Sequence, residues 1–334
     1  MHAIRLHAFG PADNLRHEVT DTPVPGPGQV RVAVAAAGVH LLDTALRQGQ
    51  QGPLPALPEL PTVPGREIAG TVDALGPGTD PAWFGRRVVA HLGFAPGGYA
   101  EYAVTGAERL HVIPPHLDPA EAVAMIGTGR TALGILQFAE LGPDAIALVP
   151  AAAGGIGTLL VQHAKNTGAT VIALAGGPAK AALAHVNGAD LALDYTRSDW
   201  PALVRAHLDA LGRPGATVLF DSVGGTVART ALDLLAPGAR HVVFGWSDSP
   251  LALTDTERAA LTARGITTEN VLGPAMLRRA GGDDPMRTLE TRALAEAAAG
   301  RLRPAVQRYP LAEAAAAHRA LETRATVGKV VLEP

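Results

Sequence analysis

A glycine turn between two apolar segments is the feature that most constrains what this chain can fold into. Residues 151–157 have the sequence AAAGGIG, follow the apolar run 145–149 and precede a helix-like run, 158–165. Strand, glycine turn and helix in this order are typical of a dinucleotide-binding unit, because the first turn of the helix offers free N–H groups and a positive dipole end to phosphates. The turn therefore predicts a nucleotide site at the start of a helix.

Two glycines of this turn have separate expected roles. Gly154 lets the backbone approach a pyrophosphate closely, and Gly157 lets the helix pack tightly on its strand. Ala152 stands where the first glycine of the G-x-G-x-x-G pattern is usually found, so the match is incomplete. A glycine turn that binds no nucleotide is the alternative interpretation of the pattern alone.

Length and composition narrow the class of protein. A chain of 334 residues, 47% hydrophobic and 18% charged, can bury a sizeable interior and suits two domains. The net charge of −3 gives no electrostatic reason to expect nucleic acid or an anionic membrane as a partner. Because the chain has no cysteine, disulfides, cysteine nucleophiles and thiolate metal sites are excluded.

The sequence also lacks membrane and export signals. No apolar span is long enough to cross a bilayer, and Met1–Arg5 has no h-region or cleavage site of a signal peptide. We therefore expect a cytoplasmic globular protein.

The organisation of the sequence changes near residue 123. Before it, short apolar runs separated by Gly- and Pro-rich turns predict a compact β-rich domain, and after it, alternating strands and helices favour a parallel, doubly wound sheet. The strands expected in the first part are residues 30–34, 68–75, 87–91 and 99–104. In the second part we expect strands at 145–149, 170–174, 191–193, 217–220 and 241–244, and helices at 130–140, 158–167, 178–187 and 226–235. A last helix, 311–322, and strand, 329–332, are expected to return to the first domain.

Several motifs are weak alone but specific in their order and spacing. They are GVHLLDT (38–44), PGREIAG (64–70), GRRV (85–88), GGYAEY (97–102), TGRTA (128–132), DSVGG (221–225) and GKVVL (328–332). Through them, over nearly its whole length, the chain resembles the medium-chain dehydrogenase/reductase superfamily, in its zinc-independent quinone oxidoreductase (zeta-crystallin-like) branch. The resemblance implies an α/β fold with a GroES-like β-rich catalytic domain and a Rossmann domain built on a doubly wound parallel sheet.

The resemblance also implies domain boundaries. We expect a GroES-like catalytic domain at residues 1–123, a Rossmann cofactor-binding domain at 124–275 and a C-terminal return to the catalytic domain at 276–334. Members of the family assemble as dimers or tetramers, so a homodimer is expected.

The positions of the catalytic zinc ligands in zinc-containing relatives are altered. Their Cys, His and Cys fall on His40, Arg66 and Gly127, and the four-cysteine structural zinc lobe is absent. A catalytic zinc needs about three protein ligands, so no metal site is expected. Without a Lewis acid, alcohol oxidation is disfavoured, and substrates that accept hydride readily, quinones or carbonyl-activated alkenes, are favoured.

The second strand of the Rossmann domain points to NADPH. Enzymes that use NAD place Asp or Glu at its end to bind the ribose 2′-OH, but here it ends at Ala175-Gly176-Gly177. Lys180 and Tyr195 match family residues that contact the 2′-phosphate, while a solvated lysine and an edge-packing aromatic are the alternatives. At the position of Gly177 the family often has Ser or Thr. Glycine has no side-chain hydroxyl, so only its backbone N–H is expected to bind the 2′-phosphate there.

The full set of expected cofactor-binding residues follows the family's motifs. Thr131 matches a position near the nicotinamide amide, with a helix-cap or core threonine as the alternative. The set is Thr131, Gly154, Gly155, Ile156, Gly176, Lys180, Tyr195, Ser222, Phe244, Gly245 and Lys329.

The expected catalytic residues are His40, Asp43 and Arg130. His40 replaces an Asn common in the family, and with Asp43 it forms a pair suited to proton donation near neutral pH. The alternative is that His40 only shapes the pocket and Asp43 caps a turn. Arg130 either orients a substrate carbonyl or forms a salt bridge within the fold.

Two further segments are expected to border the substrate. The proline-rich segment 52–64 suits a semi-rigid wall, and Trp246 is a candidate aromatic lid, with core packing as its alternative. Enoyl reductases of the family often have a Tyr shortly after the GVHLLDT motif. Ala45 and residues 48–51 offer none here, which disfavours dedicated enoyl reduction.

Together these features predict an NADPH-dependent, zinc-independent oxidoreductase. It would transfer hydride to a quinone or an α,β-unsaturated carbonyl in a cleft between the two domains. The alternative is an NADPH-binding structural or regulatory protein, crystallin-like, with little or no turnover.

Overall fold

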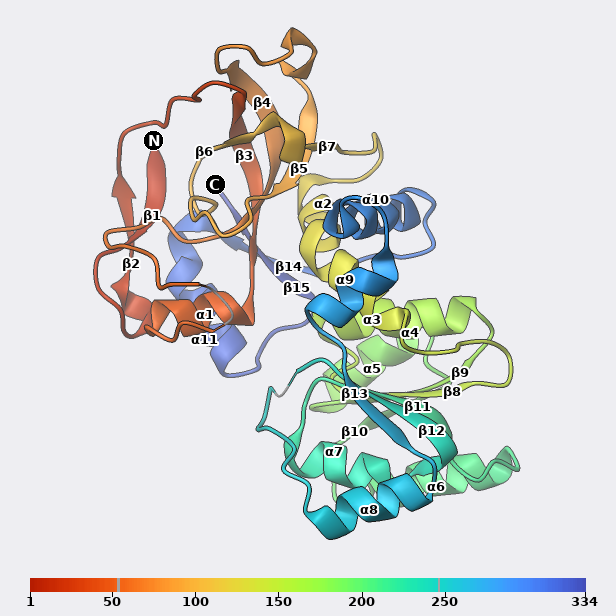
Figure 1. Ribbon diagram of the computed structural model, residues 1–334. Helices are drawn as coiled ribbons and strands as arrows, with labels where there is room; N and C mark the ends of the chain where they lie inside the picture. The colour runs from red at the N-terminus through yellow and green to blue at the C-terminus, as the bar shows by residue number, and fades with distance from the viewer. Residues whose placement is uncertain (53–54, 246) are drawn as a thin grey trace. The chain divides into compact units, whose positions relative to one another are not determined.

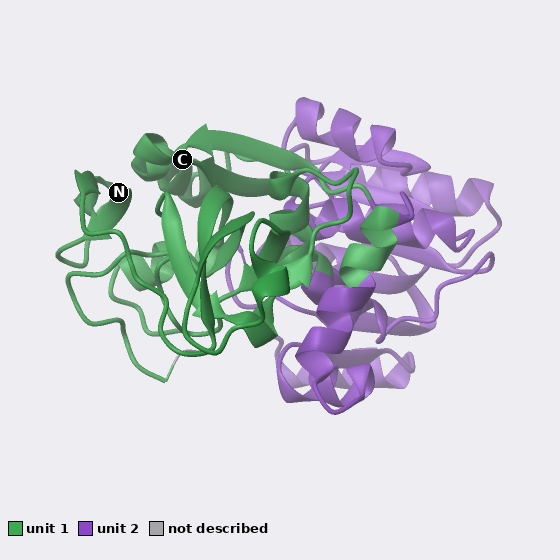
Figure 2. Cartoon of the chain, turned by 90° about the horizontal axis from the view of Figure 1, so that it is seen from above, with its two compact units in different colours: residues 1–129, 293–298, 303–334 green, residues 130–292, 299–302 purple. Residues whose placement is uncertain are grey.

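The computed structural model describes residues 1–52, 55–245 and 247–334. The chain divides into two compact units, coloured separately in Figure 2. Unit 1 comprises residues 1–129, 293–298 and 303–334, and unit 2 comprises residues 130–292 and 299–302. The domain boundaries expected from the sequence stay predictions, and the lid expected at Trp246 lies outside the described residues.

Unit 1 is built on a seven-stranded sheet and a separate antiparallel pair, β1-β2. The order along the larger sheet is β14-β15-β3-β4-β5-β7, and β6 also pairs with β3. Buried residues alternate with partly buried ones along the first half of β3, which places Val30 and Val32 in the core of the unit. The strands are β1 (His2–Leu6), β2 (Leu15–Val19), β3 (Gln29–Val39), β4 (Glu67–Leu75), β5 (Arg87–His91), β6 (Tyr102–Gly106), β7 (His111–Val112), β14 (Val306–Pro310) and β15 (Lys329–Glu333).

The helices of unit 1 are short. Asp118 caps α2, because its side chain accepts a hydrogen bond from the Glu121 N–H. Because β15 pairs antiparallel with β3, the C-terminal segment is an inner strand of this sheet. The helices are α1 (Leu41–Arg47), α2 (Pro119–Ala124) and α11 (Ala314–Glu322), and α10 (Pro285–Ala298) begins in unit 2 and ends in unit 1.

Unit 2 contains a six-stranded, wholly parallel sheet. Its order, β10-β9-β8-β11-β12-β13, is 3-2-1-4-5-6 in chain order, which is the doubly wound arrangement of dinucleotide-binding domains. Figure 1 shows α3, α4 and α5 on one face of this sheet and α6, α7 and α8 on the other. The strands are β8 (Ile146–Val149), β9 (Thr170–Ala175), β10 (Leu191–Asp194), β11 (Ala216–Asp221), β12 (Leu235–Val243) and β13 (Thr267–Asn270). The helices are α3 (Arg130–Leu136), α4 (Gly155–Asn166), α5 (Pro178–Val186), α6 (Trp200–Ala210), α7 (Gly225–Leu232), α8 (Asp255–Ala263) and α9 (Pro274–Ala280).

The buried strands of unit 2 explain why the sequence has nearly continuous apolar runs there. All four residues of β8 are buried, as expected for a strand covered on both faces by helices. The expected fold class, a GroES-like β unit with a doubly wound parallel sheet, is confirmed.

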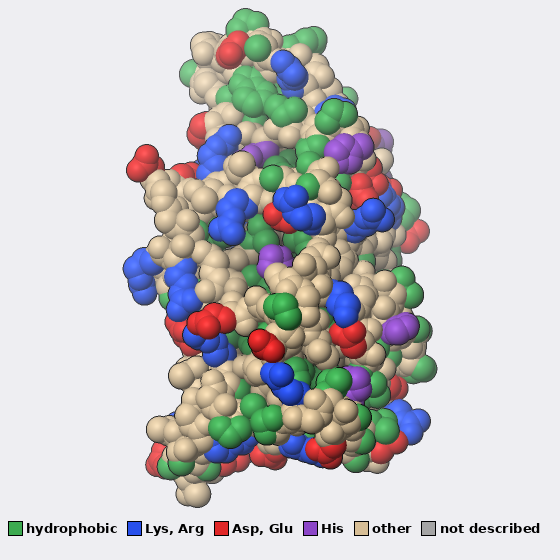
Figure 3. Space-filling model, turned by 90° about the vertical axis from the view of Figure 1, so that its right-hand side faces the viewer, with side chains coloured by type: hydrophobic (Ala, Val, Ile, Leu, Met, Phe, Trp, Pro, Cys, Tyr) green, Lys and Arg blue, Asp and Glu red, His purple; other side chains and the backbone are tan. Residues whose placement is uncertain are grey.

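The surface carries both signs of charge. On the face shown in Figure 3, acidic and basic side chains are interspersed. In the part of the chain that the structure describes, no helix has the length and apolar character needed to span a membrane.

Candidate functional site

The glycine turn adopts the geometry that the sequence predicts. The Ala152 N–H donates to Leu174 O at 3.0 Å, which ties the turn to β9, and α4 begins directly after Gly154. Gly154, Gly155 and Ile156 are partly exposed at the start of this helix. The N–H groups of a first helical turn have no partner within the helix, so they are suited to bind phosphate oxygens.

Gly157 has a steric reason to be glycine. A β-carbon at this position would collide with the Ala151 carbonyl oxygen and lie 2.8 Å from Ala152 Cα. Ala151 itself has a φ of 51°, which is rare for a residue other than glycine. The tight contact between the turn and α4 therefore depends on the missing side chain.

The expected 2′-phosphate residues lie close together at the ends of β9 and β10. A β-carbon at Gly176 would lie 3.2 Å from the Tyr195 hydroxyl, and the Tyr195 N–H donates to Ala175 O at 3.0 Å. Lys180 is on the first turn of α5, and its partial burial lowers the pKa of its ammonium group. Backbone, hydroxyl and ammonium donors thus gather at one end of the sheet.

Asp194, which the sequence did not single out, changes the expected role of Gly177. Its Oδ1 accepts hydrogen bonds from the Thr196 N–H at 2.9 Å, the Thr196 hydroxyl at 2.7 Å and the Gly177 N–H at 2.8 Å. These bonds lower the pKa of Asp194, so it is a carboxylate at neutral pH. The backbone donor expected to bind phosphate at Gly177 is therefore already engaged.

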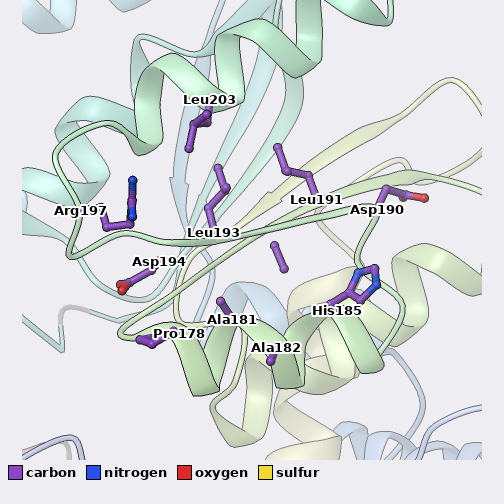
Figure 4. A pocket seen from close by; sticks show the side chains of 11 residues that line it. Pro178, Ala181, Ala182, His185, Asp190, Leu191, Leu193, Asp194, Arg197 and Leu203 are labelled. Atoms are coloured by element: carbon purple, nitrogen blue, oxygen red, sulfur yellow. The ribbon is translucent and has the colours of Figure 1, made fainter.

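Figure 4 shows a pocket of about 500 Å³ beside this region, formed by α5 and the edge strand β10. Leu191 and Leu193 form part of its wall, Asp194 and Arg197 lie at one end, and His185 lies toward the other. Asp194 lines the pocket and accepts the hydrogen bond from the Gly177 N–H, so the pocket adjoins the loop of Gly177.

The remaining cofactor residues of unit 2 lie at the carboxyl ends of β11 and β12. The Phe244 N–H donates to Asp221 O at 2.9 Å, and a β-carbon at Gly245 would lie 3.1 Å from Ser222 O. Parallel strands of a doubly wound sheet bind ligands at this edge, so Ser222, Phe244 and Gly245 have the expected placement.

Arg130 forms the salt bridge that the sequence left as an alternative. Its Nη1 lies 2.6 Å from Glu290 Oε1, and both side chains are nearly buried. Thr131 follows on α3 and is partly exposed. A role of Arg130 toward a substrate carbonyl stays a prediction.

His40 and Asp43 are at the start of α1, within a polar cluster in unit 1. Asp43 Oδ2 accepts from the His40 N–H at 2.8 Å and lies 3.3 Å from His40 Nδ1. Asp43 therefore caps the helix and also contacts the imidazole, so the pairing and the capping expected as alternatives occur together. The other imidazole nitrogen lies 2.7 Å from Glu67 Oε1.

Glu67 is the centre of this cluster. Its side chain is fully buried on β4, and Lys329 Nζ, from β15, lies 2.9 Å from its Oε2. Burial alone would raise the pKa of Glu67, but the charges of His40 and Lys329 hold it well below its usual value. Lys329 was expected to bind the cofactor; its observed contact is with Glu67, and a cofactor role stays a prediction.

The charge of His40 follows from the same contacts. Burial lowers the pKa of the imidazole, but the Glu67 and Asp43 carboxylates raise it above its usual value overall. Asp43 is ionised, because hydrogen bonds from His40 and the Arg66 charge outweigh its burial and lower its pKa. The cluster therefore favours a protonated, donating imidazole near neutral pH.

Tyr99 and His318 extend the cluster away from His40. The Tyr99 hydroxyl donates to Asp43 Oδ2 at 3.0 Å and lies 3.3 Å from His318 Nε2. Sequence reasoning missed Glu67, Tyr99 and His318 as site residues. Glu67 and Tyr99 lie inside motifs on which the family resemblance rests, so the sequence offered a signal for both residues. No such motif contains His318.

The three positions matching zinc ligands do not fit a metal site. They hold His40, Arg66 and Gly127, and a β-carbon at Gly127 would collide with Glu67 Oε1. A ligating side chain at Gly127 therefore has no room. Among the described residues, no group of three or more His, Cys, Asp or Glu is arranged to hold a metal ion.

Two family models match the chain. The model described as "Alcohol dehydrogenase GroES-like domain" matches residues 26–115, and the one described as "Zinc-binding dehydrogenase" matches residues 187–332. The chain is 33% identical to a 2-haloacrylate reductase of a Burkholderia species, over 98% of each chain. It is 32% identical to a quinone oxidoreductase of Pseudomonas aeruginosa, over 99% of each chain.

Solved structures with the same fold include nucleotide complexes. The Escherichia coli quinone oxidoreductase complexed with NADPH matches with a TM-score of 0.83 and 28% identity, and all of each chain is covered. A mycobacterial protein complexed with NADPH matches with a TM-score of 0.83 and 33% identity over the same extent. The β unit and the parallel-sheet unit, with these matches, define the class as that of the medium-chain dehydrogenases/reductases. Within this class the chain belongs to the quinone oxidoreductase family, as its motifs predicted.

Proposed function

We propose that the protein is a zinc-independent reductase that uses NADPH to reduce a quinone or an α,β-unsaturated carbonyl compound. The observation that carries the proposal is the glycine turn at the start of α4, together with the proximity of Gly176 to the Tyr195 hydroxyl and the position of Lys180 on the first turn of α5. The full-length similarity to a quinone oxidoreductase and a 2-haloacrylate reductase supports the substrate class, because both names describe electron-poor acceptors of hydride.

The residues of unit 2 fit the cofactor. The N–H groups of Gly155 and Ile156 would hold the pyrophosphate at the start of α4, and Gly154, whose own N–H donates to Ala151 O at 2.9 Å, would let it approach the backbone. Tyr195 and Lys180 would hold the 2′-phosphate. The carboxylate of Asp194 beside Gly177 would repel a phosphate. Binding of the 2′-phosphate would therefore depend more strongly on the ammonium group of Lys180. When bound, NADPH supplies a hydride to the acceptor.

The residues of unit 1 fit the second half of the reaction. Reduction of an enone places negative charge on its carbonyl oxygen before a proton arrives. The His40 side chain is 24% exposed, and its two nitrogens lie 3.3 Å from Asp43 and 2.7 Å from Glu67, so it would donate a hydrogen bond or a proton to that oxygen by giving up the longer contact, with Asp43. Substrate binding between the two domains, homodimer formation and a cytoplasmic location stay predictions.

A substrate screen tests the proposal. Purified protein is titrated with NADPH and with NADH, and NADPH consumption is then followed with a panel of quinones and enones. We expect tight NADPH binding and turnover of at least one acceptor class. Tight NADPH binding without turnover of any acceptor would instead favour the crystallin-like alternative.

A further inference from the structure

A cavity of about 370 Å³ in unit 1 lies beside α1. Its wall is mostly apolar and includes Leu6, Leu46 and the proline-rich residues 55–58. Two arginines, Arg47 and Arg66, line the same cavity, as do two carboxylates, Asp43 and the exposed Glu59. A cationic side chain in an apolar wall lowers the stability of the fold unless an anionic group pairs with it. The partners of the two arginines therefore determine what the cavity can bind.

Both guanidinium groups are withdrawn from solvent. The exposed fraction of the side chain is 1% for Arg47 and 10% for Arg66. Among the described residues, no hydrogen-bond partner reaches the buried Nε of either arginine. An arginine has five N–H donors, and a buried donor of a charged group that lacks an acceptor lowers the stability of the fold.

Neighbouring carboxylates neutralise the charges of the two arginines to different extents. Arg47 donates to Gly10 O through Nη1 and to Glu322 Oε1 through Nη2. Its charge therefore has a dedicated carboxylate partner, and its guanidinium is held in place.

Arg66 is weakly held by comparison. Its Nη2 donates to Asp43 Oδ1 at 3.3 Å, which is long for a charge-assisted hydrogen bond. Asp43 is itself shared, because its Oδ2 accepts from the His40 N–H at 2.8 Å and from the Tyr99 hydroxyl at 3.0 Å. The charge of Arg66 is thus only partly compensated, and its guanidinium retains donors for an anion in the cavity.

We infer that this cavity binds the carboxylate of a small α,β-unsaturated acid, with Arg66 as the anion-binding residue. A planar guanidinium matches a carboxylate through two parallel hydrogen bonds, and the apolar wall suits a short carbon skeleton. The inference rests on the proposed function and narrows its substrate class from activated alkenes to unsaturated acids.

Arg66 would also assist the reaction of such an acid. The C=C bond accepts a hydride from NADPH at its β-carbon and a proton from solvent at its α-carbon, and NADPH is oxidised to NADP⁺. Hydride addition moves negative charge onto the carboxylate oxygens, and a guanidinium at that position stabilises the charge as it develops.

Binding is tested first, without turnover. The protein without nucleotide is titrated calorimetrically with crotonate and with crotonamide, which has the same shape but no charge. We expect the acid to bind more tightly than the amide, and Arg66→Gln to weaken binding of the acid about 10- to 100-fold. Arg66→Lys keeps the charge without the planar fork and should give an intermediate affinity. Arg278→Gln, at an exposed position on α9, is the matched control and should change nothing.

The outcomes separate this inference from the proposed function. Equal affinity for acid and amide in the unaltered protein would overturn the inference even if Arg66→Gln failed to fold. NADPH consumption with quinones, but no preference for acids over amides, would remove the inference and leave the proposed function intact. If no acceptor consumes NADPH, the proposed function fails, while the calorimetric comparison still supports or overturns carboxylate binding by Arg66.

Discussion

The carboxylate of Glu67 occupies the space into which a side chain at Gly127 would project. Glu67 is fully buried and lies 2.7 Å from His40 Nε2 and 2.9 Å from Lys329 Nζ. An imidazole and an ammonium group thus neutralise the carboxylate where zinc-containing relatives would have a metal ligand. These two ion pairs compensate the charge of the buried carboxylate.

We therefore predict full activity without metal. Exhaustive chelation should leave the rate of acceptor reduction and the melting temperature unchanged, because Arg66 and Gly127 supply no ligand. Activity assays and thermal melts before and after chelation check this. A rate that falls on chelation and returns with zinc would show that the matching of ligand positions is wrong.

His40 is predicted to matter most for enones. His40→Ala should lower kcat about 10²- to 10⁴-fold if the imidazole donates to the substrate oxygen. Because the pKa of His40 is raised, the rate should fall as the pH rises through a value above its usual 6.5.

His40→Asn is the control for this prediction, since asparagine donates a hydrogen bond but does not titrate. If Asn retains the rate and Ala does not, His40 acts as a hydrogen-bond donor. Unchanged rates in both variants would show that His40 only shapes the pocket and that the proton comes from solvent or the cofactor ribose.

Lys180 is predicted to select NADPH over NADH. Lys180→Ala should weaken NADPH binding by about 1–3 kcal/mol, because a charge-assisted bond to the 2′-phosphate is lost, and should leave NADH nearly unchanged. Nucleotide titrations measure both. Lys165→Ala, which removes a lysine paired with Asp190, is the matched control and should affect neither nucleotide. Equal weakening of NADPH and NADH by Lys180→Ala would contradict the assignment.

His318 is predicted to make the protein less stable in mild acid. Burial lowers the pKa of this fully buried imidazole to about 4, below the value of about 6.5 in the unfolded chain. Between pH 6.5 and 4 the unfolded state therefore binds more protons, and folding should lose about 3 kcal/mol as the pH falls through this window.

Denaturant unfolding at several pH values measures this loss of stability. His318→Asn should lower stability at neutral pH but flatten the slope below pH 6.5. An unchanged slope in His318→Asn would assign the acid sensitivity to other groups.

Gly157 is predicted to tolerate no side chain. Gly157→Ala should destabilise the protein by about 1–3 kcal/mol, because the added methyl group would meet the backbone of the turn rather than a flexible side chain. NADPH binding should weaken with it, as the start of α4 shifts. Gly142→Ala, where an added β-carbon meets nothing within 4 Å, is the control for thermal melts and nucleotide titrations. Equal stability of both variants would contradict the steric argument.

The sequence allowed the parallel sheet to be predicted because its strands are buried and apolar. The predicted strand at 87–91 matches β5 in full. β13 was missed because all four of its residues, Thr267–Asn270, are exposed and polar, so no periodicity marks them. β12 begins at Leu235, six residues before the predicted start, because its pairing with β11 shifts register around a Pro-Gly pair that resembles a turn.

The candidate site was predictable only where its residues are close in sequence. His40 and Asp43 are three residues apart, and the glycine turn is contiguous. Glu67 and Tyr99 contact His40 and Asp43, and they also contact the C-terminal residues Lys329 and His318. Such pairings depend on the fold rather than on local spacing. Sequence alone therefore gives the motifs that hold Glu67 and Tyr99, but not their partners or charge states.

The place of β15 within its sheet has a consequence for biosynthesis. β15 lies between β14 and β3, so the sheet that begins with β3, at residue 29, stays incomplete until residue 333 has left the ribosome. Unit 2 has all its residues by position 302 and is able to fold earlier. Before β15 is synthesised, Glu67 lacks the ammonium group of Lys329. We therefore expect the first half of a nascent chain truncated before β15 to stay accessible to chaperones and proteases.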